Sequence, residues 1–355
     1  MRRLRATLDA ASALSFVLPA IVLCACASRP AELPEPRTDR QAPPRVQARC
    51  TEAELVACPR ACREGEASAC TLLGRASMNR PGSDPDETLR WLRRGCALSD
   101  PEACYLAAVL LQTFPREGES EDTGPLLQRA CRAAHGPACL ALALRLEARG
   151  NPGQAARWLE RGCELGVARA CFNLGVMHHQ GAGVKLDLER AAALYEQACA
   201  SGEPVACSDL GVMLREGQGG AVDHTRAREL FERACTERIA AACYNLGLQH
   251  EEGRGGPPDA TRAATLYGRA CDGGELRACN NLGLLHEEGI GVGADPTLAA
   301  QLYERACEGG LVSSCVNLGA LLELGKGVKR DPERAKELYE RACRAGVAAA
   351  CGYAR

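Results

Sequence analysis

Apolar and polar positions along the chain follow the spacing of short amphipathic helices that come in pairs. Residues 206–220, ACSDLGVMLREGQGG, have small and apolar residues at helical spacing and predict one helix, which we name helix A. Residues 223–235, DHTRARELFERAC, predict a second helix, helix B, which begins after an Asp suited to cap free amide groups. Equivalent aspartates recur twelve positions before a cysteine: Asp187, Asp223, Asp259, Asp295 and Asp331. The pattern therefore predicts a repeated helical hairpin.

The hairpin recurs at a nearly fixed interval. Cysteines at 163, 199, 235, 271, 307 and 343 are 36 residues apart, and shorter units of 34, 35 and 32 residues run from Cys62 to Cys163. Self-similarity at this length is typical of helical repeat arrays. One hairpin buries too little surface to be stable alone, so each is expected to stack on its neighbours. The spacing predicts an all-α repeat fold.

The cysteines form pairs at a second, shorter spacing. The chain has 22 cysteines, and nine pairs share a separation of eight residues. Eight residues of straight helix rise about 12 Å, whereas the α-carbons of a disulfide lie roughly 4.4–6.8 Å apart, so the chain must turn between the two cysteines. We predict bridges from the end of one helix to the start of the next: Cys62–Cys70, Cys96–Cys104, Cys131–Cys139, Cys163–Cys171, Cys199–Cys207, Cys235–Cys243, Cys271–Cys279, Cys307–Cys315 and Cys343–Cys351.

Glycines mark most of these turns. A glycine three residues after the first cysteine, where a left-handed residue closes a helix, is present at Gly166, Gly202, Gly274, Gly310 and Gly346. Cys50 and Cys58 have the same separation as the nine pairs, but Cys62 follows closely in CTEAELVACPRAC. The pairing of Cys50 and Cys58 therefore stays open.

The amino terminus predicts export. In MRRLRATLDAASALSFVLPAIVLCACASRP, arginines precede an apolar run that is too short to span a bilayer and suits a secretory signal peptide. The run ends in LCAC, which resembles a bacterial lipobox and implies cleavage before Cys26 and lipidation of that cysteine. The alternative is an ordinary signal peptide cut nearby. We assign 1–25 to the signal peptide, 26–49 to a lipidated cysteine and Pro-rich linker, and 50–61 to an N-terminal cap segment.

Composition narrows the compartment and the partners. Without Cys24 and Cys26, twenty cysteines remain, an even number that suits disulfides in an oxidising compartment. We expect a lipid-anchored protein of the cell envelope, on the periplasmic or outer-membrane face, or a secreted one. The formal net charge is −2 and acidic residues are spread along the chain, so no basic surface indicates a nucleic-acid partner.

The repeat motif resembles a known family. CxNLGxxxxxGxGVxxDxxxAxxLYExAC, clearest at 171–199 and 315–343, resembles the Sel-one-like repeat, a relative of the tetratricopeptide repeat. The cysteine-bridged form is similar to the Helicobacter cysteine-rich (Hcp) protein family. The resemblance covers 62–355 and is weaker across 104–162. It implies a right-handed αα-solenoid of about eight helical hairpins, in which the A helices line a concave groove.

Helical geometry divides helix A into two sides. Counted from the second cysteine at 100° per residue, that cysteine and positions 3, 4, 7 and 10 share one side, which we predict to be packed. Positions 2, 6 and 9 lie opposite and are predicted to face solvent or a ligand. Position 2 holds Asn173, Asp209, Asn245, Asn281 and Asn317, and position 9 holds Gln180, Glu216, Glu252 and Glu288.

The column of asparagines has two interpretations. An amide both donates and accepts hydrogen bonds, so the column suits the backbone of an extended peptide, a use that tetratricopeptide domains make of comparable asparagines. Alternatively, these side chains bond to neighbouring repeats or cap the A helices. The glutamates favour a partner with cationic or donor groups, or form an ordinary solvated face. We predict a scaffold that binds a protein, peptide or cell-wall ligand in its groove through the residues at position 2 and the three glutamates.

Motifs for catalysis or metal binding do not match this chain. His178, His250 and His286 occupy position 7, but HEE lacks the second histidine of a zinc-binding HExxH helix, so we assign them a structural role and expect no metal or cofactor. Some Hcp-family proteins are described as penicillin-binding or weakly β-lactamase active, which makes such a hydrolase the alternative function. The serine β-lactamase motifs S-x-x-K, S-D-N and K-T-G are absent from the sequence, and we assign no catalytic residue.

Overall fold

The computed structural model describes residues 50, 55–114 and 122–353. The predicted signal peptide, Cys26 and the linker lie outside these residues. Every regular element in the described parts is helical. The elements are η1 Leu55–Ala57, α1 Cys58–Arg63, α2 Ala67–Met78, α3 Pro85–Ala97, α4 Pro101–Thr113, α5 Gly124–Arg132, α6 Gly136–Ala148, α7 Pro152–Glu164, α8 Ala168–Gln180, α9 Leu188–Ala200, α10 Pro204–Glu216, α11 His224–Thr236, α12 Ala240–Glu252, α13 Ala260–Asp272, α14 Leu276–Glu288, α15 Pro296–Glu308, α16 Val312–Leu324, α17 Pro332–Arg344 and α18 Ala348–Tyr353.

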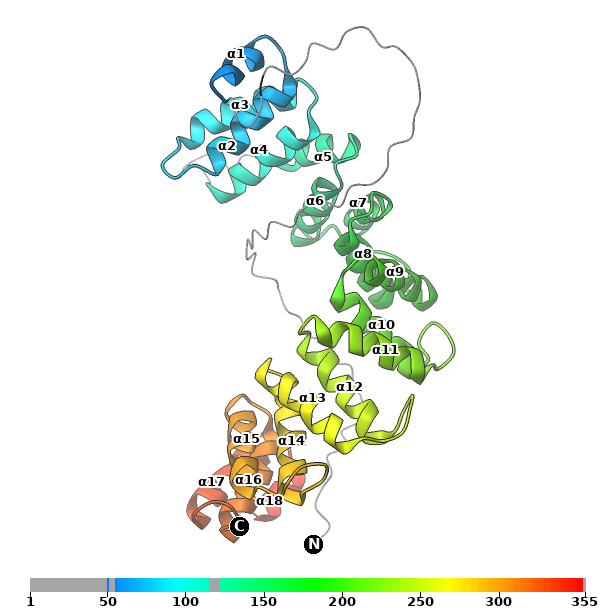
Figure 1. The fold of residues 1–355 in the computed structure, drawn as a ribbon, viewed down its shortest axis with the longest axis vertical. Helices are drawn as coiled ribbons and strands as arrows, with labels where there is room; N and C mark the ends of the chain where they lie inside the picture. The colour runs from blue at the N-terminus through cyan, green and yellow to red at the C-terminus, as the bar shows by residue number, and fades with distance from the viewer. Residues whose placement is uncertain (1–49, 51–54, 115–121, 354–355) are drawn as a thin grey trace. The chain divides into compact units, whose positions relative to one another are not determined.

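The helices pack as hairpins in chain order. Each even-numbered helix from α2 to α16 is a helix A and packs against the odd-numbered helix B that follows it, which gives eight hairpins in the described residues. Each helix B then contacts the helix A of the next hairpin, as the succession from α2 to α17 shows (Figure 1). The predicted all-α solenoid of about eight helical hairpins is confirmed.

Local sequence sets the limits of each helix. The Asp223 carboxylate accepts a hydrogen bond of 2.9 Å from the amide of Arg226 and so caps the start of α11. Helix α10 ends at Gly217, whose φ of 71° is left-handed and costs a glycine nothing. The same cap is made by the other predicted aspartates, Asp187, Asp259, Asp295 and Asp331.

Disulfides close the turn between each helix B and the next helix A. All nine predicted pairs are bonded, and Cys50 and Cys58 form a tenth bridge in the described residues. Their α-carbons lie 4.5–4.8 Å apart, within the range that a disulfide requires. Gly202 turns the chain with a φ of 90°, whereas the equivalent Ser99, Ala134 and Arg238 adopt positive φ despite their side chains. The turn geometry is therefore kept even where the sequence does not favour it.

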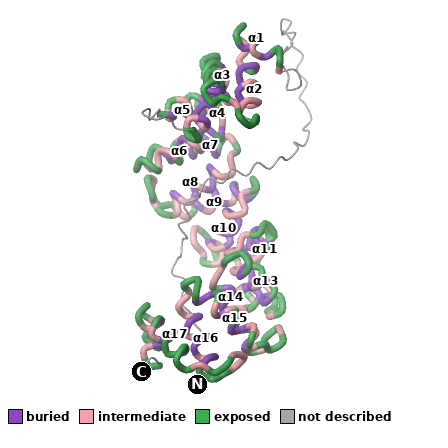
Figure 2. Tube along the Cα trace, turned by 90° about the vertical axis from the view of Figure 1, so that its left-hand side faces the viewer, coloured by how far each residue is buried: buried purple, intermediate pink, exposed green. Residues whose placement is uncertain are grey.

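The core is built from small residues, and in each of the five hairpins from α8 to α17 one aromatic ring of helix B fits between them. In helix A, Gly247 lies against the ring of Tyr267 from helix B, and a Cβ atom at residue 247 would come within 2.6 Å of that ring. The same contact joins Gly175 to Tyr195 and Gly283 to Tyr303. One buried cluster runs from α6 to α15, and Figure 2 shows buried stretches recurring in successive hairpins between exposed loops. The core is thus continuous across neighbouring repeats, as repeat stacking requires.

From α11 onward, an arginine in helix B ties each repeat to the one before it. Arg233 donates to the backbone carbonyl of Cys199 at 2.8 Å, and Arg269 makes the equivalent bond to Cys235 at 2.8 Å. Arg305 and Arg341 continue the series. The acceptor is the first cysteine of the preceding bridge, so the charged hydrogen bond and the disulfide hold the same turn. Sequence analysis missed this bond, although an arginine two residues before the cysteine recurs at the repeat period.

Candidate interaction surface

The packed side of helix A is wider than predicted. Cys243, Leu246 and Gly247 are buried in α12, as the helical wheel indicated. Position 6 was predicted to face solvent, and this was wrong: its residues are between 0 and 4% exposed, namely Met177, Met213, Gln249, Leu285 and Leu321. Each helix A packs against its own helix B and also lies beside the previous repeat, so a second flank of the helix is buried.

The side of helix A that remains accessible is formed by positions 2, 5 and 9 after the second cysteine in α8, α10, α12, α14 and α16. We call it the open face. Its middle row, position 5, is half-buried and mostly branched and apolar: Val176, Val212, Leu248, Leu284 and Ala320. Gln180, Glu216, Glu252 and Glu288 at position 9 are exposed along one edge. An apolar row between polar rows is the usual composition of a binding groove.

The residues at position 2 are half-buried, and three of them make hydrogen bonds within the array. Asn245 accepts from the Arg215 guanidinium at 2.9 Å. Asn317 donates to the Asn280 side chain of the preceding helix A at 2.9 Å. Asn281 is hydrogen-bonded to the Tyr267 hydroxyl of the previous hairpin. These contacts match the structural interpretation of the column, in which the amides connect neighbouring repeats.

Asp209 is the one carboxylate at position 2, and its environment disfavours the charge. Burial raises its pKa from the ordinary 3.8 to about 6, while the nearby Arg169 acts in the opposite direction. The Arg169 guanidinium is shared, because it donates to Glu203 at 3.2 Å and lies 5.1 Å from the Phe172 ring centre. Burial, and then Asp209, raise the pKa of Tyr195. This site therefore titrates near neutral pH.

A row of tyrosine–carboxylate pairs lies beside the open face, at position 8. The hydroxyl of Tyr267 donates to Glu251 at 2.6 Å, and Tyr303 and Tyr339 make the same bond to Glu287 and Glu323 at 3.0 and 3.1 Å. Burial, and then the adjacent carboxylate, raise the pKa of Tyr267, so its hydroxyl keeps its proton and remains a donor. Sequence analysis missed this row. The signal was the recurrence of Tyr and Glu sixteen residues apart at the repeat period.

Neighbouring arginines partly neutralise the negative charge of the exposed glutamates at position 9. Glu216 forms an ion pair with Arg215 at 3.0 Å, and Glu252 forms one with Arg254 at 2.8 Å. Both pairs are at the surface, where such contacts contribute little to stability. They reduce the net negative charge of the face without covering it.

The histidines at position 7 have a structural role in at least one repeat. His250 is 7% exposed, and the Arg228 guanidinium lies 3.0 Å from its Nδ1. Burial, and then that arginine, lower the pKa of His250 and so disfavour a charge on the ring. His178 Nδ1 donates to the Lys185 carbonyl oxygen, 3.3 Å away. Within the described residues no group of three or more His, Cys, Asp or Glu side chains is placed to hold a metal ion.

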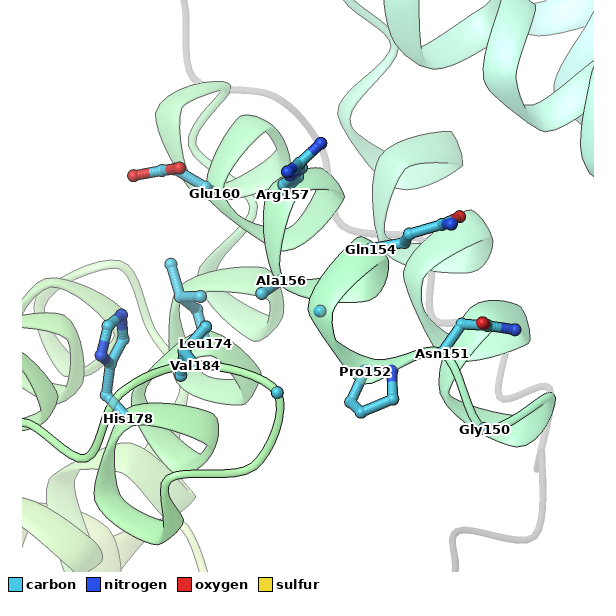
Figure 3. Close-up of a pocket in the computed structure, with 12 residues that line it drawn as sticks. Gly150, Asn151, Pro152, Gln154, Ala156, Arg157, Glu160, Leu174, His178 and Val184 are labelled. Carbon is cyan, nitrogen blue, oxygen red and sulfur yellow. The ribbon is translucent and has the colours of Figure 1, made fainter.

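A pocket of about 800 Å³ opens between α7 and α8. Pro152, Gln154 and Ala156 line it from α7, and His178 of α8 faces them across the opening (Figure 3). His178 is on the packed side of α8, so the pocket is separate from the open face. Its lining brings together no pair of side chains arranged as a nucleophile and a base.

Two features bear on location. The described residues hold a disulfide in every repeat, a density typical of proteins in oxidising, extracytoplasmic compartments. None of the described helices has the length and apolar content that crossing a bilayer requires.

Solved structures with the same architecture include Sel1-type proteins. The c5321 protective antigen of uropathogenic Escherichia coli, which displays an SLR fold, is 25% identical with a TM-score of 0.71; the match covers 75% of this chain and 58% of that one. A Sel1 repeat protein from Oxalobacter formigenes is 22% identical with a TM-score of 0.67, over 84% and 88% of the two chains. Helicobacter pylori cysteine rich protein B is 28% identical over 37% of this chain and 94% of that chain, with a TM-score of 0.31. No curated protein matches the chain in sequence.

The family model described as Sel1 repeat matches seven segments. They are residues 67–100, 137–167, 168–203, 204–237, 240–275, 276–311 and 312–347. These segments span seven of the eight hairpins described above, all but α4 and α5, and cover more than half of the sequence. The chain therefore belongs to the Sel1 repeat family, a scaffold fold typical of protein–protein interaction.

Proposed function

We propose that this protein is an exported, lipid-anchored scaffold that binds a protein, peptide or cell-wall ligand along the open face. The observation that carries the proposal is the half-buried apolar row of position 5, which packs on the core at one side and reaches solvent at the other. Polar side chains border this row along both edges, so apolar contact and hydrogen bonding are available together.

The disulfides support a binding role through rigidity. A bridge at each turn limits how far one hairpin moves against the next. A surface that is already ordered loses less conformational entropy when a ligand binds. The lipid anchor at Cys26 and the linker that follows would hold this surface away from a membrane. We propose no catalysis, because no specific observation in the described residues favours the alternative hydrolase.

Binding is tested by cross-linking the intact protein in envelope extract, identifying the partner by mass spectrometry and measuring its affinity with purified components. Substitution of Val212, Leu248 and Leu284 by Ser removes apolar contact from the open face and should weaken binding at least tenfold. The matched control replaces three exposed, equivalent helix B positions by Ser: Glu229, Thr265 and Gln301. Equal loss in both variants, or in neither, would refute the face as the binding surface.

The anchor is tested separately by metabolic labelling with a fatty acid. Cys26→Ser should abolish incorporation and release the protein from membranes. Cys24→Ser, two residues earlier, is the matched control and should leave both unchanged. Labelling that survives Cys26→Ser would overturn the lipidation proposal and favour an ordinary signal peptide.

A further inference from the structure

Three tyrosine–carboxylate pairs follow one another along the array, but they differ in what lies against the carboxylate. At Glu287 the ammonium group of Lys326 lies 3.3 Å from a carboxylate oxygen and 3.4 Å from the backbone carbonyl of the same residue. Lys326 comes from the loop of the next hairpin and leaves the Glu287 side chain only 3% exposed. Lys326 thus shows how an ammonium group binds to a tyrosine–carboxylate pair of this chain.

One repeat earlier the same pair has no ammonium group. Glu251 accepts a hydrogen bond from the Tyr267 hydroxyl, as Glu287 does from the Tyr303 hydroxyl. The residue equivalent to Lys326 is here Ile290, which is 37% exposed. Glu251 is exposed, and the described residues contain no ion pair to it. The carboxylate is therefore accessible and uncompensated.

Cations near this site are engaged elsewhere. Arg277 donates to both carboxylate oxygens of Glu275, at 2.8 and 3.2 Å, and lies over the Tyr244 ring. Arg215 donates to Asn245 and to Glu216. Neither is positioned to neutralise Glu251, so the charge there is left for a ligand.

We propose that Glu251 and Tyr267 form a subsite for a primary ammonium group, supplied by a lysine side chain of the bound protein or peptide. The methylene groups of that lysine would cover Ile290, and the ammonium group would take the place that Lys326 occupies one repeat later. This inference rests on the proposed function, because the open face beside the subsite would bind the rest of the ligand. The subsite predicts that ligands carry a lysine at a fixed distance along the chain from the residues that contact the open face.

Isoleucine methyl groups give a direct test. The sequence has only three isoleucines, Ile21, Ile239 and Ile290, so a spectrum of protein labelled at isoleucine δ1 methyls is simple to assign. Ile239 lies at the opposite end of α12 from Glu251, about 18 Å along the helix, and serves as the internal control. The probes are the blocked amino acids Nα-acetyl-lysine methylamide and its norleucine analogue, which lacks the ammonium group.

The lysine probe should shift the Ile290 resonance in a saturable manner, with a dissociation constant on the order of millimolar, and added salt should weaken it. Ile239 should not move, and the norleucine probe should have no effect. Glu251→Gln should weaken binding at least tenfold, whereas Glu229→Gln, which changes an exposed carboxylate of α11 away from the open face, should not. Lys326→Ile should open a second site at Glu287 and at the same time place a new methyl reporter there.

Three results would overturn the subsite. They are equal shifts of Ile290 with the norleucine probe, lysine-probe binding that Glu251→Gln does not weaken, or equally tight binding of an arginine derivative blocked in the same way. The probe measurement needs no partner, so it stands apart from the test of the proposed function. If the lysine probe binds but no partner binds to the open face, the proposed scaffold function is refuted and the subsite is not. If a partner binds with an affinity that Glu251→Gln does not change, and the lysine probe shifts no resonance, the subsite is refuted and the scaffold function is not.

Discussion

Replacing Asp209 by Asn should stabilise the protein at neutral pH. The other four A helices of the open face carry Asn at this position, and only Asp209 has to bury a charge. Its folded-state pKa of about 6 lies above the ordinary 3.8, so the folded protein binds this proton more tightly than the unfolded chain does. Stability from this group is greatest below pH 4 and is lost as the pH rises from about 4 to about 6.

The size of the effect follows from the same two values. A difference between 3.8 and about 6 corresponds to about 3 kcal/mol at 1.36 kcal/mol per pKa unit. This is an upper limit for the gain from Asp209→Asn above pH 6. Below pH 4 both side chains are neutral and nearly the same shape, so the gain should approach zero.

The assay is the thermal unfolding midpoint of both proteins from pH 3.5 to 8, with hydrogen exchange of α8 to α10 to locate the change, because repeat arrays do not always unfold in one step. The midpoints should coincide at low pH and separate between pH 4 and 6. Asn245→Asp is the matched control: its carboxylate would meet Arg215, so it should not show the same loss at neutral pH. A gain independent of pH, or destabilisation at pH 7, would refute the reasoning.

Three further substitutions test the packing. Gly247→Ala should destabilise by about 1–3 kcal/mol, because the added methyl group would lie 2.6 Å from the Tyr267 ring; an unchanged denaturation midpoint would show that the ring moves freely. Arg238→Gly should raise the free energy of unfolding by up to about 1 kcal/mol, since the residue holds a φ of 62°, and a decrease would mean that its side chain contributes more than the strain costs. Replacing Cys271 and Cys279 together by Ala should cost about 2.5 kcal/mol, measured by denaturant unfolding, and no loss would contradict the loop-closure estimate.

The hairpins and bridges could be predicted because their causes are local and periodic. The Asp223 cap, the glycine turn at residue 202 and the cysteine spacing each act within a few residues and recur at 36. The accessible side of helix A was predicted less well. A helical wheel assumes a single buried side, but Gln249 at position 6 is 1% exposed, in a helix that packs against both α11 and α13. Which flank a neighbour covers depends on stacking, which the wheel does not contain.

Contacts between side chains could not be predicted from the sequence either, even where the residues that make them recur. Arg228 reaches His250 across 22 residues and passes beside Gly256, where a Cβ atom would lie 2.3 Å from the guanidinium in its present position. The equivalent pairs in other hairpins are Ala156 with Val184, Ala192 with Gly220, Ala264 with Val292 and Ala300 with Val328. The arginine is thus present only in a hairpin where the second position is glycine. The sequence contains both members but not their contact.

The α10–α11 hairpin shows that the contact between repeats matters more than the residues that make it. Phe231 replaces the tyrosine there and has no hydroxyl to donate, so a glutamate at position 8 would lose its partner. Arg215 stands at that position instead, lies 5.9 Å from the Phe231 ring centre and donates directly to Asn245 of the next helix A. A longer side chain spans the gap that a tyrosine hydroxyl bridges elsewhere. Because both members changed together, restoring the tyrosine alone would give its hydroxyl no carboxylate.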